Sequence, residues 1–293
     1  MSTRAQLDCA RLGRWTACIL VALVVALPGL ARAESDAAVL PTGCGPGSTV
    51  VGVAAVVDAR TVTLADGREL RLAGIEVPAA DAGAAQSKAH GDAKAYLESL
   101  VAGRTVALGG AEHDRYGRLV AHAFVTGAEP TREPPREPPR EPPRWIQAEL
   151  VAQGHARVAG RRDAGACTAA LRQRERQARA AQLGVWADPY YGLRRADDPA
   201  AVSRERGRFA IVEGRVVSVR ESGGTLYVNF GGRWSTDFTV TIAKRQERTF
   251  AEAGLEPKRL AGRRIQVRGW IEERGGPWID ATAPEQIEVV ERN

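Results

Sequence analysis

The chain has 293 residues, of which 44% are hydrophobic and 26% are charged, and its formal net charge is +6. It is long enough for a sizeable core and for two domains of about 100–150 residues each, and it is not a coherent repeat array. The modest positive charge does not by itself imply a polyanionic partner.

Residues 1–33 have the composition of a signal peptide. Three arginines precede an uncharged apolar run, residues 15–30, and Ala31-Arg32-Ala33 then supplies small residues for a signal peptidase. We predict cleavage after Ala33 and export to the bacterial periplasm or the exterior, with no membrane span left in the mature chain. The alternative, an uncleaved anchor, is disfavoured because a spanning helix needs about 20 apolar residues. Four arginines and one aspartate leave with this segment, so the net charge falls from +6 to +3.

The mature chain keeps two cysteines, Cys44 and Cys167. Disulfides persist in an exported protein, so we predict that they pair and tie the N-terminal segment, residues 34–48, to the first domain. Two unpaired thiols are the alternative. The spacing is not a metal signature, since no CxxC motif and no close histidine pair accompanies it.

The first domain is predicted to cover residues 49–187. Residues 49–57 and 61–72 read as strands, with Asp66-Gly67 as a turn. Residues 86–100 have helical periodicity, with Gly103 placed as a cap. Two further strands, 105–108 and 118–125, and two helices, 145–154 and 167–183, follow. Between them residues 129–144 carry three REPP repeats, which predict a solvated polyproline II insert, either a docking motif or a repeat expansion in a loop.

Residues 188–207 are polar, with no sustained period, and are predicted to be a linker. A second β-rich unit follows at residues 208–291. Its expected strands are 210–219, 224–230, 238–242, 264–271 and 286–290, with a helix near 248–253. Five strands with a helix between the third and fourth is the order of an OB-fold, and the first domain has a related plan. The predicted fold class is therefore β-rich α+β: a five-stranded OB-fold barrel with helices, followed by a second OB-like barrel.

Four sequence blocks resemble the staphylococcal nuclease-like (thermonuclease) family. They are VVDARTVTLADGRELRLAGIEVPA (56–79), DRYGRLVAHAFV (114–125), WIQAELVAQGHARV (145–158) and LGVW (183–186), in that order. The resemblance covers about residues 50–186, and the C-terminal unit looks like the OB-like extension of some exported bacterial members. It implies a calcium-dependent phosphodiesterase with a carboxylate-bound metal, a glutamate base and two arginines on the phosphate.

The resemblance places the phosphate-contacting arginines at Arg71 and Arg118. The alternative is that each arginine has a structural role and forms an ion pair with Glu76 or Asp114. Tyr116, in the DRYGR motif, either stacks on a base or fills the corner of the hairpin.

The metal and base positions depart from the family pattern. Where members read DGDT this chain has Asp58-Ala59-Arg60-Thr61, so Arg60 replaces a ligand aspartate, while Glu76 replaces the other and Ala79 replaces the base. A methyl group accepts no proton, and a cation at residue 60 repels calcium. Asp58 and Glu76 would then be weak or non-functional ligands, with Asp81 as a substitute base. No cofactor is expected unless the site is functional, in which case it is Ca²⁺.

The second domain offers aromatic residues for base stacking. They are interleaved with Arg233, Arg264 and Arg268. Ile265, Val267 and Ile271 share one strand face, so Trp270 should face outward if that set is core. A tryptophan that caps the end of the barrel is the alternative. The aromatic candidates are Tyr227, Trp234, Trp270 and Trp278.

Three functions are compatible with these residues. The first is a degenerate nuclease-like module in which Arg60, Arg71 and Arg118 hold single-stranded nucleic acid or another polyanion without efficient cleavage. The second is an active calcium-dependent nuclease with a displaced base. The third is a cell-envelope module that binds a protein or a glycan. The sequence does not identify this partner.

Overall fold

The structure is a computed structural model that describes residues 44–128, 142–160 and 167–290, which contain five α-helices and several β-sheets. The predicted signal peptide and residues 129–141 of the predicted insert lie outside these residues. No helix in the described ranges is long and apolar enough to span a membrane.

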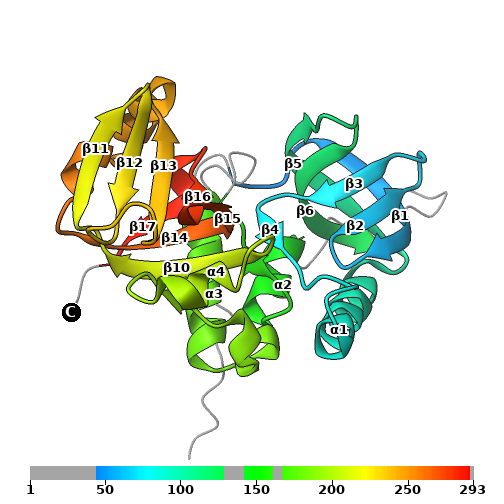
Figure 1. The fold of residues 1–293 in the computed structure, drawn as a ribbon. Helices are drawn as coiled ribbons and strands as arrows, with labels where there is room; N and C mark the ends of the chain where they lie inside the picture. Colours follow the sequence, from blue (N-terminus) through cyan, green and yellow to red (C-terminus); the bar gives the residue numbers. More distant parts are fainter. Residues whose placement is uncertain (1–43, 129–141, 161–166, 291–293) are drawn as a thin grey trace, which may run out of the picture. The chain divides into compact units, whose positions relative to one another are not determined.

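Six strands form the first sheet, in the order β3-β2-β1-β5-β6-β7 (Figure 1). They are β1 (Thr49–Asp58), β2 (Thr61–Leu64), β3 (Glu69–Leu72), β5 (Arg104–His113), β6 (Leu119–Ala128) and β7 (Arg144–Trp145). Strand β3 also pairs with β6 in parallel, so β1, β2, β3, β6 and β5 hydrogen-bond in a closed cycle. The predicted turn between β2 and β3 is present: Gly67, with φ 83°, donates its N–H to the Leu64 carbonyl.

Three helices and a short two-stranded sheet complete this part of the chain. The helices are α1 (Ala84–Val101), α2 (Ile146–Ala152) and α3 (Thr168–Ala180), and the strands are β4 (Ile75–Glu76) and β8 (Arg157–Val158). Helix α1 buries Ala93, Leu97, Leu100 and Val101 in the core that the sheet also lines. Strands β4 and β8 are antiparallel and place Glu76 opposite Arg157.

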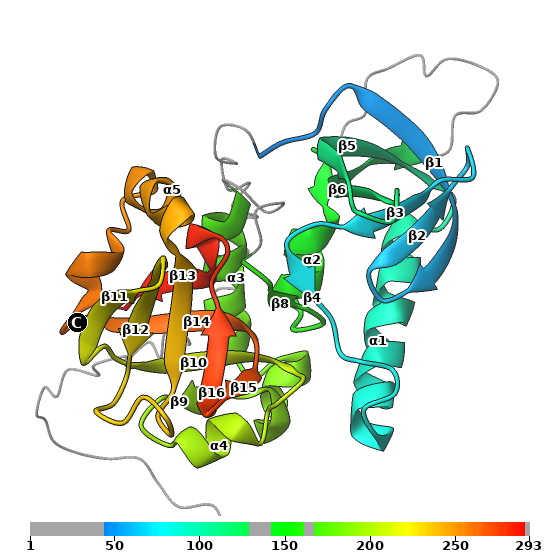
Figure 2. The same cartoon turned by 45° about the horizontal axis from the view of Figure 1, so that its top comes forward.

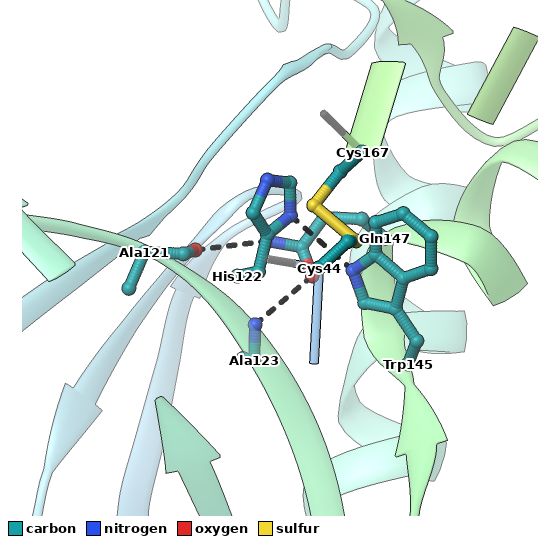
Figure 3. Close-up of a disulfide and its surroundings, with 7 residues drawn as sticks. All are labelled: Cys44, Ala121, His122, Ala123, Trp145, Gln147 and Cys167. Atoms are coloured by element: carbon teal, nitrogen blue, oxygen red, sulfur yellow. Dashed lines mark hydrogen bonds between the residues drawn. A yellow bond between two sulfur atoms is a disulfide. The ribbon is translucent and has the colours of Figure 1, made fainter. Parts of the chain in front are cut away.

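The two mature cysteines form a disulfide, with their Cα atoms 5.2 Å apart (Figure 3). Cys44 precedes β1, and Cys167 precedes α3 directly, so the bond ties the N-terminal end of the described chain to this helix. Both cysteines are buried in the first core. Beside them the Gln147 side chain bonds to the backbone of the buried strand β6: its Nε2 donates to the Ala121 carbonyl at 2.9 Å, and its Oε1 accepts the Ala123 N–H at 3.1 Å.

The stretch expected to be a linker is folded. It contains a 3₁₀ helix (Pro189–Tyr191), β9 (Arg194–Arg195) and α4 (Pro199–Ser203), and β9 pairs in parallel with β10. Arg194 organises this stretch, because its guanidinium donates to the carbonyls of Tyr190 and Gly192 and forms an ion pair with Glu205 at 2.7 Å. Part of the polar composition of the stretch therefore reflects internal hydrogen bonds, although Arg195 and Asp197 are exposed.

The C-terminal part has two sheets, β17-β14-β10-β9 and β11-β12-β13-β16-β15 (Figure 2). The elements are β10 (Phe209–Arg215), β11 (Ser218–Ser222), β12 (Thr225–Asn229), β13 (Thr239–Ala243), α5 (Glu247–Glu252), β14 (Arg264–Trp270), β15 (Glu272–Arg274), β16 (Gly276–Asp280) and β17 (Ile287–Val289). Strands β15 and β16 were not predicted, because residues 272–277 lack an apolar alternation. Gly275, with φ 86°, makes the tight hairpin between them.

A buried ion pair connects β14 to α3. Arg268 Nη1 lies 2.9 Å from Glu175 Oε2, and each side chain is only 1% exposed. Arg268 also donates to the Val158 carbonyl at 2.9 Å, and Glu175 accepts the Val158 N–H at 2.6 Å. The prediction that Arg268 belongs to an exposed stacking face is therefore wrong. The reason is tertiary: α3 contacts the middle of β14, whereas Trp270, two residues further along the same face, is 45% exposed.

Candidate functional site

The turn between β1 and β2 and the strand β4 bring Arg60 and Glu76 together. Arg60 Nη1 lies 2.7 Å from Glu76 Oε2, and Glu76 is only 6% exposed. The Asp58 carboxylate accepts the Arg60 backbone N–H at 2.8 Å, as in an Asx-type turn. The two carboxylates on the metal side of the site are thus engaged, Glu76 by a guanidinium and Asp58 by the turn.

The DRYGR turn between β5 and β6 is held by its aspartate. Asp114 accepts the backbone N–H groups of Tyr116 and Arg118 at 2.9 and 3.0 Å and forms an ion pair with the Arg118 guanidinium at 2.8 Å. Burial would raise the pKa of Asp114, but these donors outweigh it and hold the pKa below its usual value. Gly117, with φ 77°, permits the turn. The structural alternative, in which Arg118 pairs with Asp114, is what the geometry shows.

The other two predicted contacts are Arg71, on β3, and Tyr116, within the DRYGR turn. Arg71 is half-buried on β3, opposite Thr61 of β2 and Val120 of β6. Tyr116 is exposed, and the Arg118 guanidinium lies 5.4 Å from its ring centroid. Its ring therefore does not fill a hairpin corner, and the Arg115 guanidinium also lies near it, 4.7 Å from the centroid.

The loop after β4 carries Ala79 and Asp81, both exposed. It is anchored to α1, because the Ser87 hydroxyl donates to the Ala80 carbonyl and His90 Nδ1 lies 2.8 Å from the Pro78 carbonyl. The Asp81 side chain makes no ion pair or hydrogen bond with any described residue. The loop thus holds an alanine at the base position and one unpaired carboxylate two residues later.

A cavity of about 410 Å³ adjoins this loop. Its wall includes Glu76, Ala79 and Asp81 from the family site, together with Arg157 of β8 and Trp270 of β14. Sequence analysis selected Trp270 but missed Arg157. The only signal for Arg157 was a charged residue within the short apolar run of HARVA, and this pattern does not reveal what the guanidinium faces.

Two of the remaining aromatic candidates, Tyr227 and Trp278, lie on β12 and β16, and Trp234 lies in the loop between β12 and β13. Tyr227 stands opposite Arg220 on the neighbouring strand, and both line a second cavity of about 520 Å³ with the exposed Trp234. Trp278 is half-buried, and the Arg274 guanidinium lies 3.7 Å from its ring centroid. The arginines beside these rings are Arg220 and Arg274 rather than the predicted Arg264 and Arg268.

The residues at the family site do not fit a calcium ion. Calcium requires several oxygen ligands, but the Glu76 carboxylate already forms an ion pair with the Arg60 guanidinium at 2.7 Å. Within the ranges that the structure describes, no group of three or more Asp, Glu, His or Cys side chains is placed to hold a metal. No catalytic step can therefore be built through a metal from these side chains.

The closed cycle of strands, the helix α1 after the third strand and the DRYGR turn define a nuclease-type, OB-like domain. The family model described as "Staphylococcal nuclease homologue" matches residues 69–188, so the chain contains a domain of that family. The match includes Arg71, Glu76 and Arg118, and begins after Asp58 and Arg60. No curated protein matches the chain.

Proposed function

We propose that this chain binds nucleic acid through its staphylococcal nuclease-like domain without hydrolysing it efficiently. The observation that carries the proposal is the Arg60–Glu76 ion pair at 2.7 Å, since the family mechanism needs both positions for a metal. A metal ion beside Arg60 would be repelled by several kcal/mol at a separation of about 4 Å and an effective dielectric constant of about 20.

The base position supports the same proposal. Ala79 accepts no proton, so a water molecule at the phosphate would need another carboxylate. Asp81 is exposed on the loop after β4, whereas Asp58 is engaged by its own turn. Neither carboxylate is held towards the arginines by a hydrogen bond in the described residues.

Phosphate binding does not require the missing groups. Arginine guanidinium groups recognise phosphate oxygens through paired N–H donors, and nearly all of the chain's cationic residues are arginines. The Arg115 and Arg118 guanidinium groups flank the exposed ring of Tyr116, at 4.7 and 5.4 Å from its centroid. This is an arrangement suited to a base with its phosphate.

The C-terminal part would contribute a second nucleic-acid surface. Strand β10 pairs with β14, β11 pairs with β12, and β13 pairs in parallel with β16. These pairings resemble those of the first domain, in which β1 pairs with β2 and β5, and β3 is parallel to β6. We interpret this part as a second OB-like barrel whose Tyr227 and Trp234 stack on bases. Export to the periplasm or the exterior is proposed with it, supported by the signal-like N-terminus and the disulfide.

The test is fluorescence anisotropy of a labelled oligothymidylate with the purified protein, in chelator and in calcium. We expect binding that weakens strongly between about 50 and 200 mM salt, because released counterions dominate such affinities. Intact DNA should remain at the end of the titration. Cleavage in calcium would instead support an active nuclease with a displaced base, and the absence of binding at low salt would support the envelope-interaction alternative.

A further inference from the structure

Arg157 is a buried cation that forms no ion pair with the residues that the structure describes. The residue is 8% exposed, and its guanidinium carbon lies 5.1 Å from the Tyr191 ring centroid and 4.9 Å from that of Phe209. It makes no hydrogen bond or ion pair with any residue in the described ranges. Removing a guanidinium from water costs several kcal/mol, and stacking on two rings recovers only part of that.

The carboxylates around Arg157 are committed to other arginines. Glu76, its partner across the β4–β8 pair, is bound to Arg60 at 2.7 Å. Glu175 is bound to Arg268 at 2.9 Å, and Glu205 to Arg194 at 2.7 Å. Burial lowers the pKa of Arg157, and the negative charges of Glu76 and Glu175 partly oppose this by raising the pKa. The charge of Arg157 is therefore available to an anion from outside the chain.

The 410 Å³ cavity gives such an anion a place beside Arg157. Its wall also carries the arginines Arg206 and Arg208 and the hydroxyl-bearing Tyr191. Tyr191 is only 3% exposed, and its hydroxyl has no hydrogen-bond partner, so a donor is left unsatisfied in the wall. The cavity wall contains three acidic residues, of which Glu76 and Glu205 form ion pairs with arginines. The third, Asp81, is exposed on the loop.

An aromatic surface completes the cavity. The Trp270 indole is 45% exposed on its wall, and the volume is within the range of sites for small ligands, about 300–1,000 Å³. Because Arg157 is only 8% exposed, a terminal phosphate reaches it more easily than a phosphodiester, which carries a nucleoside on both sides. The donors match a phosphate, and the indole matches a base.

We propose that this cavity binds a nucleoside phosphomonoester, with the phosphate on Arg157 and Tyr191 and the base against Trp270. The monoester is either a free nucleotide or the phosphorylated end of a strand. The strand-end source rests on the proposed function, whereas the free-nucleotide source does not. The proposed contacts come from β8, β14 and the folded stretch 188–207, whereas Glu76 and Ala79, at the family's metal and base positions, line another part of the same wall.

The test compares three probes on the purified protein: thymidine monophosphate, and oligothymidylate with either a phosphate or a hydroxyl at its 5′ end. We expect the phosphorylated end to bind about ten- to hundredfold more tightly, as the loss of one charged hydrogen-bond pair would imply. The Arg157→Met variant, which keeps the apolar stem between the two rings, should lose this preference. Arg248→Met removes an exposed arginine of α5 and should retain it.

The outcomes separate this proposal from the previous one. Oligothymidylate that binds equally with either end, together with no binding of thymidine monophosphate, would overturn the cavity proposal and leave nucleic-acid binding intact. Binding of thymidine monophosphate without DNA binding would support the cavity with a free nucleotide and reject the proposed function. If Arg157→Met does not fold, Trp270→Leu and competition by inorganic phosphate on the unaltered protein decide. Phosphate that fails to compete would overturn the assignment.

Discussion

Replacing one member of the buried Arg268–Glu175 pair should destabilise the protein severely. The Arg268→Met variant removes the guanidinium, 2.9 Å from Glu175, and leaves a carboxylate that is 1% exposed with no bound cation. It also removes the hydrogen bond from Arg268 to the Val158 carbonyl. The Glu175→Gln variant leaves the opposite charge unpaired, while its amide oxygen can still accept the Val158 N–H.

The magnitude follows from the distance and the burial. At 2.9 Å the attraction between unit charges is about 6 kcal/mol with an effective dielectric constant of about 20. Breaking a buried pair typically costs about 3–5 kcal/mol, because the remaining charge is uncompensated. Arg172 attracts Glu175 and Glu288 lies 3.7 Å from Arg268, so the neighbours soften the loss and the lower end of the range applies. We therefore expect each single variant to lose about 3 kcal/mol of unfolding free energy.

The coupling energy between Arg268 and Glu175 is measured by urea unfolding of the wild type, both single variants and the double variant. The double variant carries neither charge of the pair and keeps the hydrogen bond from the Val158 N–H, so it should be at least about 2 kcal/mol more stable than the sum of the single effects predicts. A coupling energy below about 0.5 kcal/mol would refute the claim that this pair holds β14 to α3.

Three further predictions concern other features of the fold. Replacing both Cys44 and Cys167 by serine should lower the unfolding free energy by about 2–5 kcal/mol, since the bond closes a loop of 123 residues, and a reducing agent should then have no further effect on melting. Gly160→Ala should destabilise the protein, because φ is 65° and a Cβ would collide with the Glu285 carbonyl, and an unchanged melting temperature would contradict this. Burial raises the pKa of Tyr191 to about 12, so stability should fall as the pH rises from about 10 to 12, where the unfolded state ionises first. The tyrosinate absorbance of the native protein should include a component that titrates near pH 12, and Tyr191→Phe should remove it.

Local signals accounted for much of the first domain. The Asp66-Gly67 turn needs a residue with positive φ, and the helix expected at 86–100 is observed at Ala84–Val101. The departures at Arg60 and Ala79 were visible in the sequence because the neighbouring motifs fix the alignment. What those residues would do was not visible: the pairing of Arg60 with Glu76 depends on two segments brought together by the fold.

The errors have a common physical origin. Alternation along β14 places Arg268 and Trp270 on one face, but only tertiary packing decides that α3 covers one of them. Arg157 was missed for the same reason, since its sequence neighbours do not show that the nearby carboxylates are already bound. Residues 188–207 were read as a linker because of their mixed charges, but Arg194 folds the segment by binding the Tyr190 and Gly192 carbonyls and the Glu205 carboxylate.

The central claim, that an ion pair and an alanine have replaced the metal and base of a nuclease site, is tested most directly by digestion of single-stranded DNA in calcium and in chelator. The unaltered protein should leave the DNA intact in both conditions. The Arg60→Asp, Ala79→Glu variant, which restores the family's carboxylates, should gain cleavage that depends on calcium. Calcium-dependent cleavage by the unaltered protein would contradict the account and would direct the search for the base to Asp81 and Asp58.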